Sequence, residues 1–166
     1  GITAEGVRDR LRGPKGTRVD VTVLRSGAVI PFSLRRDTIP IESIDAAYTV
    51  ESGIVYVKLS RFAQNSASEF IDALRDNAER RPRGIIIDLR DNVGGFMDAA
   101  IRMANEFLPE GQLIVFAEGR KYPRQMEYAN GTGSMQRIPL VVLVNEGSAS
   151  ASEIFAGAIQ DNDRGT

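Results

Sequence analysis

Two short runs of apolar residues constrain the fold of this chain more than any other feature of its sequence. Residues 84–89 (GIIIDL) and 140–144 (LVVLV) are apolar throughout, apart from one aspartate. A short uninterrupted apolar run is typical of a strand buried on both faces, as in a parallel sheet covered by helices. Each run leads into a polar turn and then into a helical pattern. The second half of the chain therefore predicts an α/β fold with a mainly parallel sheet layered with helices.

Local patterns predict the other elements. Thr3 can cap a helix with Val7 and Leu11 on one face, and Ser66 with Glu69 three residues later forms a capping box for another helix. Residues that mix charge, Gly and Tyr without periodicity predict an exposed loop that holds at most one short strand. The expected elements are a helix at 4–12, hairpins at 18–36 and 44–59, a helix from 66 to the 80–83 segment, helices at 97–108 and 150–159, a strand at 113–117 and that loop at 119–137.

The chain is expected to divide at residues 37 and 38. One helix and two strands cannot cover their own apolar faces, so residues 1–37 are expected to be the end of a small domain whose other strands precede Gly1. Asp37 to Pro40 is polar and ends in a proline, which is typical of a connector. Residues 38–166 then form the larger domain.

Two residue types that commonly act as nucleophile, general base or metal ligand are absent, because the sequence has no His and no Cys. This excludes disulfides, thiolate nucleophiles, Ser-His-Asp triads and the commonest zinc ligands. Any nucleophilic chemistry must then use Lys, a carboxylate or an N-terminal amine as its base. The formal net charge of −1 over 166 residues argues against nucleic acid or an anionic membrane surface as the main partner, because both favour a concentrated basic excess.

The first strand-to-helix junction, residues 88–96, carries paired glycines. Ligands in parallel sheets bind beyond the carboxyl ends of the strands. Gly94 and Gly95 allow the backbone to approach a ligand closely and to aim N–H groups at negative charge. The alternative is a tight turn that needs positive φ and is closed by Asp91 and Asn92. The residues alone leave both interpretations open.

The second junction, residues 144–153, carries three serines separated by alanines. A serine oxygen at a helix N-terminus is easier to ionise, and the next backbone N–H can stabilise an oxyanion. Ser152 with Glu153 could instead cap the helix, and the small residues could allow close packing. Two such junctions on parallel strands of one sheet favour a site, with a nucleophile from one and an oxyanion donor from the other.

These residues and spacings resemble the carboxyl-terminal processing (tail-specific) proteases, the Ser/Lys peptidases of the S41 class. The resemblance covers the entire chain, and its most specific part is the serine-rich segment. The first segments resemble the end of that family's PDZ domain and its junction to the protease. The matching segments are residues 2–7 (ITAEGV), 12–17 (RGPKGT), 36–40 (RDTIP), 53–62 (GIVYVKLSRF), 88–95 (DLRDNVGG) and 147–156 (GSASASEIFA).

The resemblance implies a crotonase/ClpP-like layered protease core behind the C-terminal part of a PDZ domain, in a chain truncated at both ends. It implies that Ser150 is the nucleophile and that the N–H of Ala151 and one N–H from Gly94 or Gly95 form the oxyanion hole. It implies no metal and no other cofactor. The family's base is a lysine roughly 25 residues beyond the serine, whereas this chain stops at Thr166. The fragment itself is therefore expected to be inactive.

Other charged residues are expected at the surface. The three lysines are interpreted as solvated, with Lys58 alternatively snorkelling at an edge of the sheet. Arg90 and Asp91 are also interpreted as solvated, and the alternative is that they orient the diglycine turn by ion pairing. Asp88 lies inside a buried strand and is expected to be hydrogen-bonded. The lysines are Lys15, Lys58 and Lys121.

The resemblance also implies partners. The family's PDZ helix forms one wall of a groove for a peptide tail, which would place Val7 and Leu11 near the peptide; the alternative is that both pack the small domain's own core. Protein or peptide substrates with accessible C-termini, an extracytoplasmic location, and no nucleic acid are expected, and a homo-oligomer stays open. Two other functions compete: acyl-thioester chemistry on a crotonase-like fold, and a non-catalytic peptide-binding or assembly scaffold.

Overall fold

The computed structural model describes residues 2–37, 42–50, 53–77 and 82–166. The chain divides into two compact units, residues 1–41 and residues 42–166. Parts of three sequence expectations fall outside the described residues. They are residues 38–40 of the connector, Glu51 and Ser52 in the turn of the hairpin expected at 44–59, and residues 80 and 81 of the segment expected to end the second helix. No helix in the described parts is long and apolar enough to span a membrane.

The first unit contains α1 (Ala4–Leu11), β1 (Arg18–Arg25) and β2 (Ala28–Arg35), as predicted. The Thr3 hydroxyl caps α1 by accepting the Gly6 N–H at 3.1 Å. β1 and β2 pair antiparallel through a turn in which Ser26 and Gly27 both have positive φ. No residue of α1 is buried, so this unit leaves its apolar side chains partly exposed.

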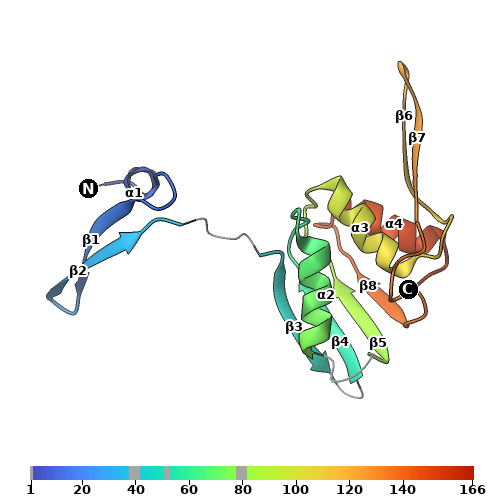
Figure 1. Cartoon of the computed structure of the whole chain (residues 1–166), viewed down its shortest axis with the longest axis horizontal. Coiled ribbons are helices and arrows are strands. Elements are labelled where there is room, and N and C mark those ends of the chain that lie inside the picture. Colours follow the sequence, from blue (N-terminus) through green and yellow to red (C-terminus); the bar gives the residue numbers. More distant parts are fainter. Residues whose placement is uncertain (1, 38–41, 51–52, 78–81) are drawn as a thin grey trace. The chain divides into compact units, whose positions relative to one another are not determined.

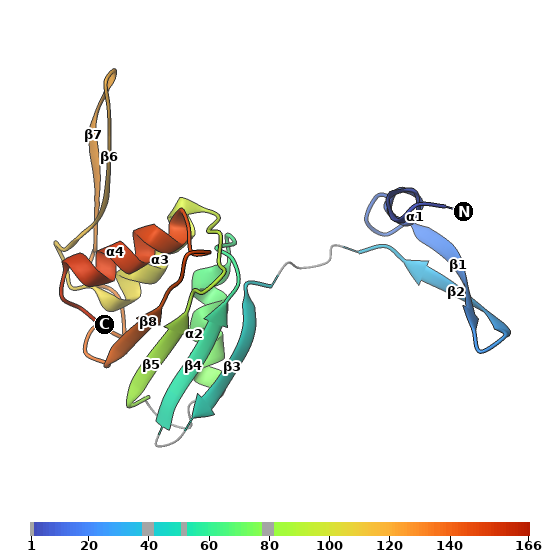
Figure 2. The ribbon, with the colours of Figure 1, turned by 180° about the vertical axis from the view of Figure 1, so that it is seen from behind.

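The second unit is built on a four-stranded sheet in the order β3-β4-β5-β8 (Figure 1). β4, β5 and β8 are parallel, and β3 pairs antiparallel with β4, so the predicted mainly parallel sheet is confirmed. Helix α2 covers one face of β3 and β4, while Figure 2 shows no helix in front of the other face. The elements are β3 (Ile44–Val50), β4 (Ile54–Leu59), α2 (Ser66–Asn77), β5 (Gly84–Asp88), α3 (Met97–Phe107), β8 (Leu140–Leu143) and α4 (Ala151–Asp161).

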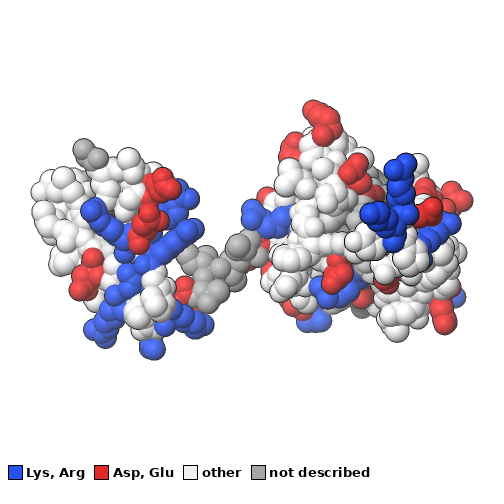
Figure 3. All heavy atoms as spheres, turned by 90° about the horizontal axis from the view of Figure 1, so that it is seen from above, with Lys and Arg blue, Asp and Glu red and all other residues white. Residues whose placement is uncertain are grey.

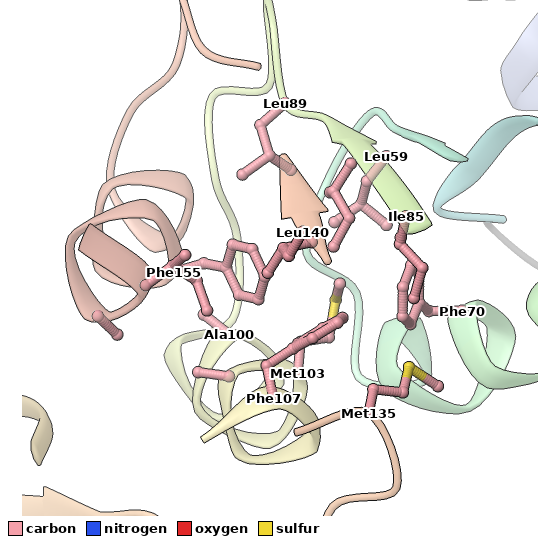
Figure 4. Packing of buried hydrophobic residues seen from close by; sticks show 14 of the residues in the cluster. Leu59, Phe70, Ile85, Leu89, Ala100, Met103, Phe107, Met135, Leu140 and Phe155 are labelled. Carbon is pink, nitrogen blue, oxygen red and sulfur yellow. The ribbon is translucent and has the colours of Figure 1, made fainter. Parts of the chain in front are cut away.

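The hydrophobic core lies between this sheet and the three helices. Alternate residues of β4 are fully buried, as expected for a strand with one face under helices. Phe107 of α3 lies between Phe70 of α2 and Phe155 of α4, with ring centroids 5.9 and 6.0 Å away (Figure 4). This packing holds α3 and α4, which follow the two junctions, against each other and against the sheet.

The second apolar run is less buried than predicted. Val141 is 39% exposed and Val144 is 51% exposed. The physical reason is that β8 is the edge strand of the described sheet, with β5 on one side only. β5 is the buried central strand that the sequence predicts.

The segment expected as an exposed loop at 119–137 is exposed in its first part and contains there the one strand that the prediction allowed. β6 (Leu113–Gly119) and β7 (Tyr122–Tyr128) form an antiparallel hairpin that projects from the body of the unit (Figure 1) and does not join the main sheet. Every residue of β7 is exposed. Burial imposes no apolar alternation on such a strand, so periodicity could not reveal it.

The predicted capping box of α2 is also wrong. Ser66 is buried inside the first turn, where its hydroxyl accepts the N–H of Ala63 at 2.7 Å. Glu69 instead accepts hydrogen bonds from both the N–H and the hydroxyl of Ser43 and from the side chain of Asn65. A partner 26 residues away in the sequence displaces the local one.

Charge differs between the units. Basic side chains outnumber acidic ones in residues 1–41, and the reverse holds in residues 42–166. Figure 3 shows both signs interspersed on the visible face of the larger unit.

Candidate active site

The two junctions lie side by side at the carboxyl ends of neighbouring parallel strands. β5 pairs with β8 from Ile85 and Leu140 to Asp88 and Leu143, and each strand then turns toward a helix. The Leu89 N–H donates to the Leu143 carbonyl at 2.8 Å, which continues this pairing into the turns. The expected meeting of the diglycine turn and the serine-rich turn is therefore confirmed.

Ser150 occupies a strained backbone conformation at the N-terminus of α4. Its φ of 55° and ψ of −115° are rarely adopted by residues other than glycine. Its N–H donates to a Glu153 carboxylate oxygen at 2.7 Å, and its carbonyl accepts the N–H groups of Glu153 and Ile154. The residue is exposed. Strain of this kind collects at functional sites, and a sharp strand-to-helix turn presents a serine hydroxyl to solvent.

The capping alternative for Ser152 is wrong. Glu153 caps the helix through the backbone of Ser150, while Ser152 is fully buried. The Ser152 hydroxyl donates to the carbonyl of Asn92 at 2.8 Å. Of the serines at 148, 150 and 152, only Ser150 is exposed.

The backbone of Gly94 packs closely against the serine-rich turn. A Cβ added there would lie 2.6 Å from the Ala149 carbonyl oxygen, 2.8 Å from the Ala151 nitrogen and 2.8 Å from the Ser150 Cβ. Gly94 also has a φ of 96°. Both the close approach and the positive φ require glycine, so the bare backbone of this turn lies directly against Ser150.

The two glycines differ in their N–H groups. The Gly94 N–H donates to the Asn92 side-chain oxygen at 2.9 Å, and Gly94 is buried. Gly95 is exposed, and its N–H has no hydrogen-bond partner within the described residues. The N–H of Ala151, at the first position of α4, likewise has none there. Gly95 and Ala151 thus offer two unoccupied donors, one from each turn.

Phe62 fixes the far side of the diglycine turn. Its N–H donates to the Gly94 carbonyl at 2.9 Å, and its carbonyl accepts the Phe96 N–H at 2.8 Å. A Cβ at Gly95 would lie only 2.1 Å from the Phe62 carbonyl oxygen. In this bridge the N–H and C=O of Gly95 point away from Phe62, which leaves them available for an extended peptide.

Asn145 is a site residue that sequence reasoning missed. Its side-chain oxygen accepts the Asp91 N–H at 2.8 Å, and its side-chain nitrogen donates to the Asp91 carboxylate at 2.9 Å. Ser148 adds a bond from its hydroxyl to the Leu89 carbonyl at 2.8 Å. The sequence feature that could have indicated Asn145 is its place three residues before Ser148 in a polar turn. That pattern favours local side-chain hydrogen bonds but does not predict the distant partner Asp91.

Asp88 anchors the start of the diglycine turn. Its carboxylate is fully buried, as expected for a hydrogen-bonded group, and accepts the Tyr56 hydroxyl at 2.6 Å. Arg90 donates to it from its backbone N–H and from its guanidinium, at 2.9 and 2.6 Å. The bonds from Arg90 hold the pKa of Asp88 well below its usual value, although burial opposes this. Burial and the bond to Asp88 raise the pKa of Tyr56.

The ion-pairing alternative therefore holds for Arg90, and the interpretation of Lys58 as solvated is wrong. Arg90 folds back onto Asp88, two residues away, and Lys58 donates to the Arg90 carbonyl at 2.8 Å and lies 3.7 Å from Asp88. Both are drawn in by the buried carboxylate at the adjacent position of the sheet. Lys15 and Lys121 are exposed, and Lys15 pairs with Asp37 at 2.7 Å. Within the described residues no acidic cluster is suited to a metal ion.

Val7 and Leu11 belong to the other unit. They are 39% and 42% exposed, on a helix with no buried residue. Their suggested contact with a peptide tail stays a prediction.

A match to a known family agrees with this arrangement. The description of peptidase family S41 fits residues 53–166, which include both turns. The chain belongs to peptidase family S41. The predicted family resemblance is thus confirmed.

Relatives of this S41 chain carry processing-protease names. It is 42% identical over 163 residues to a carboxyl-terminal-processing protease of Synechocystis, covering 95% of this chain and 38% of that protein. It is 35% identical over 161 residues to the carboxy-terminal processing protease CtpA of Bacillus subtilis, covering 92% of this chain and 32% of that protein. The chain thus spans 32–38% of the length of these relatives.

Solved structures agree with the fold. The photosystem II D1 C-terminal processing protease superimposes with a TM-score of 0.65 at 28% identity, over 99% of this chain and 46% of that one. A peptidase from Parabacteroides merdae gives a TM-score of 0.58 at 23% identity, over 75% and 42% of the two chains, and supports the fold alone.

Proposed function

We propose that this S41 chain carries the nucleophile and the oxyanion hole of a serine endopeptidase that cleaves proteins near their carboxyl termini. Ser150 is the nucleophile, and the N–H groups of Gly95 and Ala151 are the oxyanion donors. The observation that carries the proposal is the contact of Gly94 with Ser150 and Ala151, because it brings two unoccupied backbone donors beside one exposed, strained serine. The names of the relatives supply the preference for carboxyl termini.

The reaction follows from these groups. As the Ser150 hydroxyl oxygen attacks a peptide carbonyl carbon, its proton passes to a base and the carbonyl oxygen gains negative charge. The N–H groups of Gly95 and Ala151 stabilise that charge, where losing one such donor typically costs roughly 10²–10³ in rate. The C–N bond then breaks, the amine leaves with the proton, and water hydrolyses the acyl group on Ser150.

The lysine base that the family resemblance implies is not one of the three lysines of residues 1–166. Lys58 is held by Asp88 and the Arg90 carbonyl, and Lys15 pairs with Asp37 in the first unit. Lys121 is exposed on the turn of the β6–β7 hairpin. We place the general base in the remainder of the full-length protein, as a lysine kept neutral by burial. The 166-residue chain alone is then inactive.

Peptide cleavage by the full-length protein tests this proposal. Ser150→Ala should abolish cleavage and labelling by a serine-directed fluorophosphonate, while Ser68→Ala, at an exposed serine of α2 outside both turns, keeps both. Cleavage that survives Ser150→Ala would refute the nucleophile. A folded full-length protein that neither cleaves peptides nor reacts with the probe would favour the scaffold function instead.

Further parts of the proposal rest on the family. Residues 1–37 would be the end of a PDZ domain, with Val7 and Leu11 on the wall of a groove for a peptide tail. Substrates would be proteins with accessible carboxyl termini in an extracytoplasmic compartment. The core would share the layered arrangement of crotonase and ClpP-like proteins. Competition of a peptide with a free carboxyl terminus, against its amidated form, tests the groove directly.

A further inference from the structure

One buried residue, Asn92, joins the two turns of the candidate site. Its side chain has no exposed surface. Its amide nitrogen donates to the Leu59 carbonyl at the end of β4, at 2.8 Å, and its side-chain oxygen accepts the Gly94 N–H at 2.9 Å. Its backbone carbonyl accepts the Ala149 N–H at 3.0 Å and the Ser152 hydroxyl at 2.8 Å.

These four bonds hold the groups on both sides of the reacting centre. Two of them reach Ala149 and Ser152, which lie on either side of Ser150 in the sequence. A third reaches Gly94, the residue before Gly95. By occupying the Gly94 N–H, Asn92 also leaves Gly95 as the free donor of the pair. We infer that Asn92 is a positioning residue, which sets the distance between the Gly95 N–H and the Ser150 hydroxyl. This inference rests on the proposed function of Ser150.

A second connection between the turns is weaker. The bonds between Asn145 and Asp91 are exposed, so water competes for the same groups. The side-chain bonds of Asn92 are buried, where a lost partner leaves a polar group unsatisfied. These buried side-chain bonds fix Asn92 between Leu59 and Gly94, and the Asn92 carbonyl accepts the buried bond from Ser152, so the spacing of the turns depends on Asn92 more than on the outer pair.

Asn92→Ala in the full-length protein removes both side-chain bonds. We expect kcat for Ser150-dependent peptide cleavage to fall about 10- to 100-fold while KM stays within about threefold, because misplacement by 1 Å can cost 10²-fold in the chemical step. Asn162→Ala is the matched control. Asn162 also makes two side-chain bonds, to the carbonyls of Leu113 and Ala158, but at the other end of α4. It should leave kcat within about twofold.

Asn92→Asp gives a readout that general destabilisation does not. The aspartate keeps the acceptor for Gly94 but, when ionised, places negative charge against the Leu59 carbonyl. When protonated, it can donate to that carbonyl and reproduce both bonds of asparagine. The ratio of kcat for this variant to kcat for the parent protein should therefore rise as pH falls. A ratio that stays constant with pH would count against the inference.

Hydrogen exchange decides the inference even if cleavage cannot be followed. In the full-length protein, Asn92→Ala should speed exchange in the segments 93–97 and 148–152, whereas Asn162→Ala should not. If Asn92→Ala does not fold, Ser152→Ala removes one bond to the same carbonyl and should show a smaller effect at the same segments. Unchanged exchange, or unchanged kcat with Ser150-dependent cleavage, would overturn the inference. Cleavage that does not need Ser150 would overturn the proposed function instead.

Discussion

At the scale of single residues, the candidate site depends on close approach of backbone atoms. Gly94 lies so near Ala149, Ser150 and Ala151 that no larger residue fits. Ser150 adopts a positive φ at the point of contact. The site therefore requires both the positive φ of Ser150 and the absence of a side chain at Gly94, which allows the two turns to lie against each other.

Gly94→Ala tests this close approach. The added Cβ would lie under 3 Å from two backbone atoms, so the turns must separate, and we expect a loss of about 3 kcal/mol or more in the free energy of unfolding. Gly111→Ala is the control, because Gly111 also has a positive φ of 83° but nothing within 4 Å of an added Cβ. It should cost about 1 kcal/mol from backbone strain alone. Urea denaturation measures both, and equal losses would argue against the contact.

Sequence reasoning reached Ser150 and the glycine pair but could not choose between the glycines. That choice depends on the direction of each N–H and on the Asn92 side chain, which folds back two residues to Gly94. It also treated Arg90 as solvated, because the pairing with Asp88 arises from burial of the carboxylate at the end of β5. Residue types at a spacing indicate a site, whereas hydrogen-bond direction is decided by the folded chain.

Asp88 gives a pH-dependent prediction. Its pKa is lowered in the folded protein, so the stability that its ionised form contributes is complete above the unfolded pKa of about 4 and is lost as pH falls below it. Asn at this position cannot pair with Arg90, and we expect Asp88→Asn to cost about 2–3 kcal/mol at pH 7, since Arg90 is half-exposed. The difference from the parent protein should shrink toward pH 2. Asp72→Asn, at an exposed pair with Arg75, should cost little at any pH.

At the scale of elements, most helices and strands of the larger unit contribute buried residues to the core, whereas β7 contributes none. Buried alternation in β4 and the apolar stripe of α3 were legible in the sequence because burial selects them. β7 could be allowed only as a short strand without bounds, because all its residues are exposed and burial imposes no pattern on them. The capping box of α2 was misassigned because Glu69 bonds a residue from a distant strand end. Elements are predictable to the extent that the core or local bonds determine them.

Shortening the β6–β7 hairpin tests its independence from the core. Replacing residues 117–125 by a two-residue Asn-Gly turn removes only exposed residues, and it retains Ile114, which is 5% exposed. We expect the melting temperature to change by less than about 3 °C, because few buried contacts are lost. Ile114→Ala should lower it clearly more. A large loss on shortening would show that the tip of the hairpin supports the fold.

At the scale of the whole molecule, stability is concentrated in one of the two units. All the buried side chains among the described residues lie between Ser43 and Ile159. The first unit has its predicted helix and hairpin but no buried side chain in the described part, which agrees with the expectation that one helix and two strands cannot cover their own apolar faces. Local patterns were enough to predict those elements, yet they could not supply a core.

Separate expression of the two units tests this division. Residues 42–166 contain all the buried side chains of the described chain, so we expect them to fold alone, with dispersed amide NMR signals and cooperative thermal unfolding. Residues 1–41 should give the spectrum of an unfolded chain, because a hairpin and one helix without buried apolar area cannot offset the conformational entropy of folding. A Phe155→Ala variant of residues 42–166 checks that the unfolding observed belongs to the core, since losing this buried ring should cost about 3–5 kcal/mol. A cooperative transition in residues 1–41, or none in residues 42–166, would show that the core has been assigned to the wrong unit.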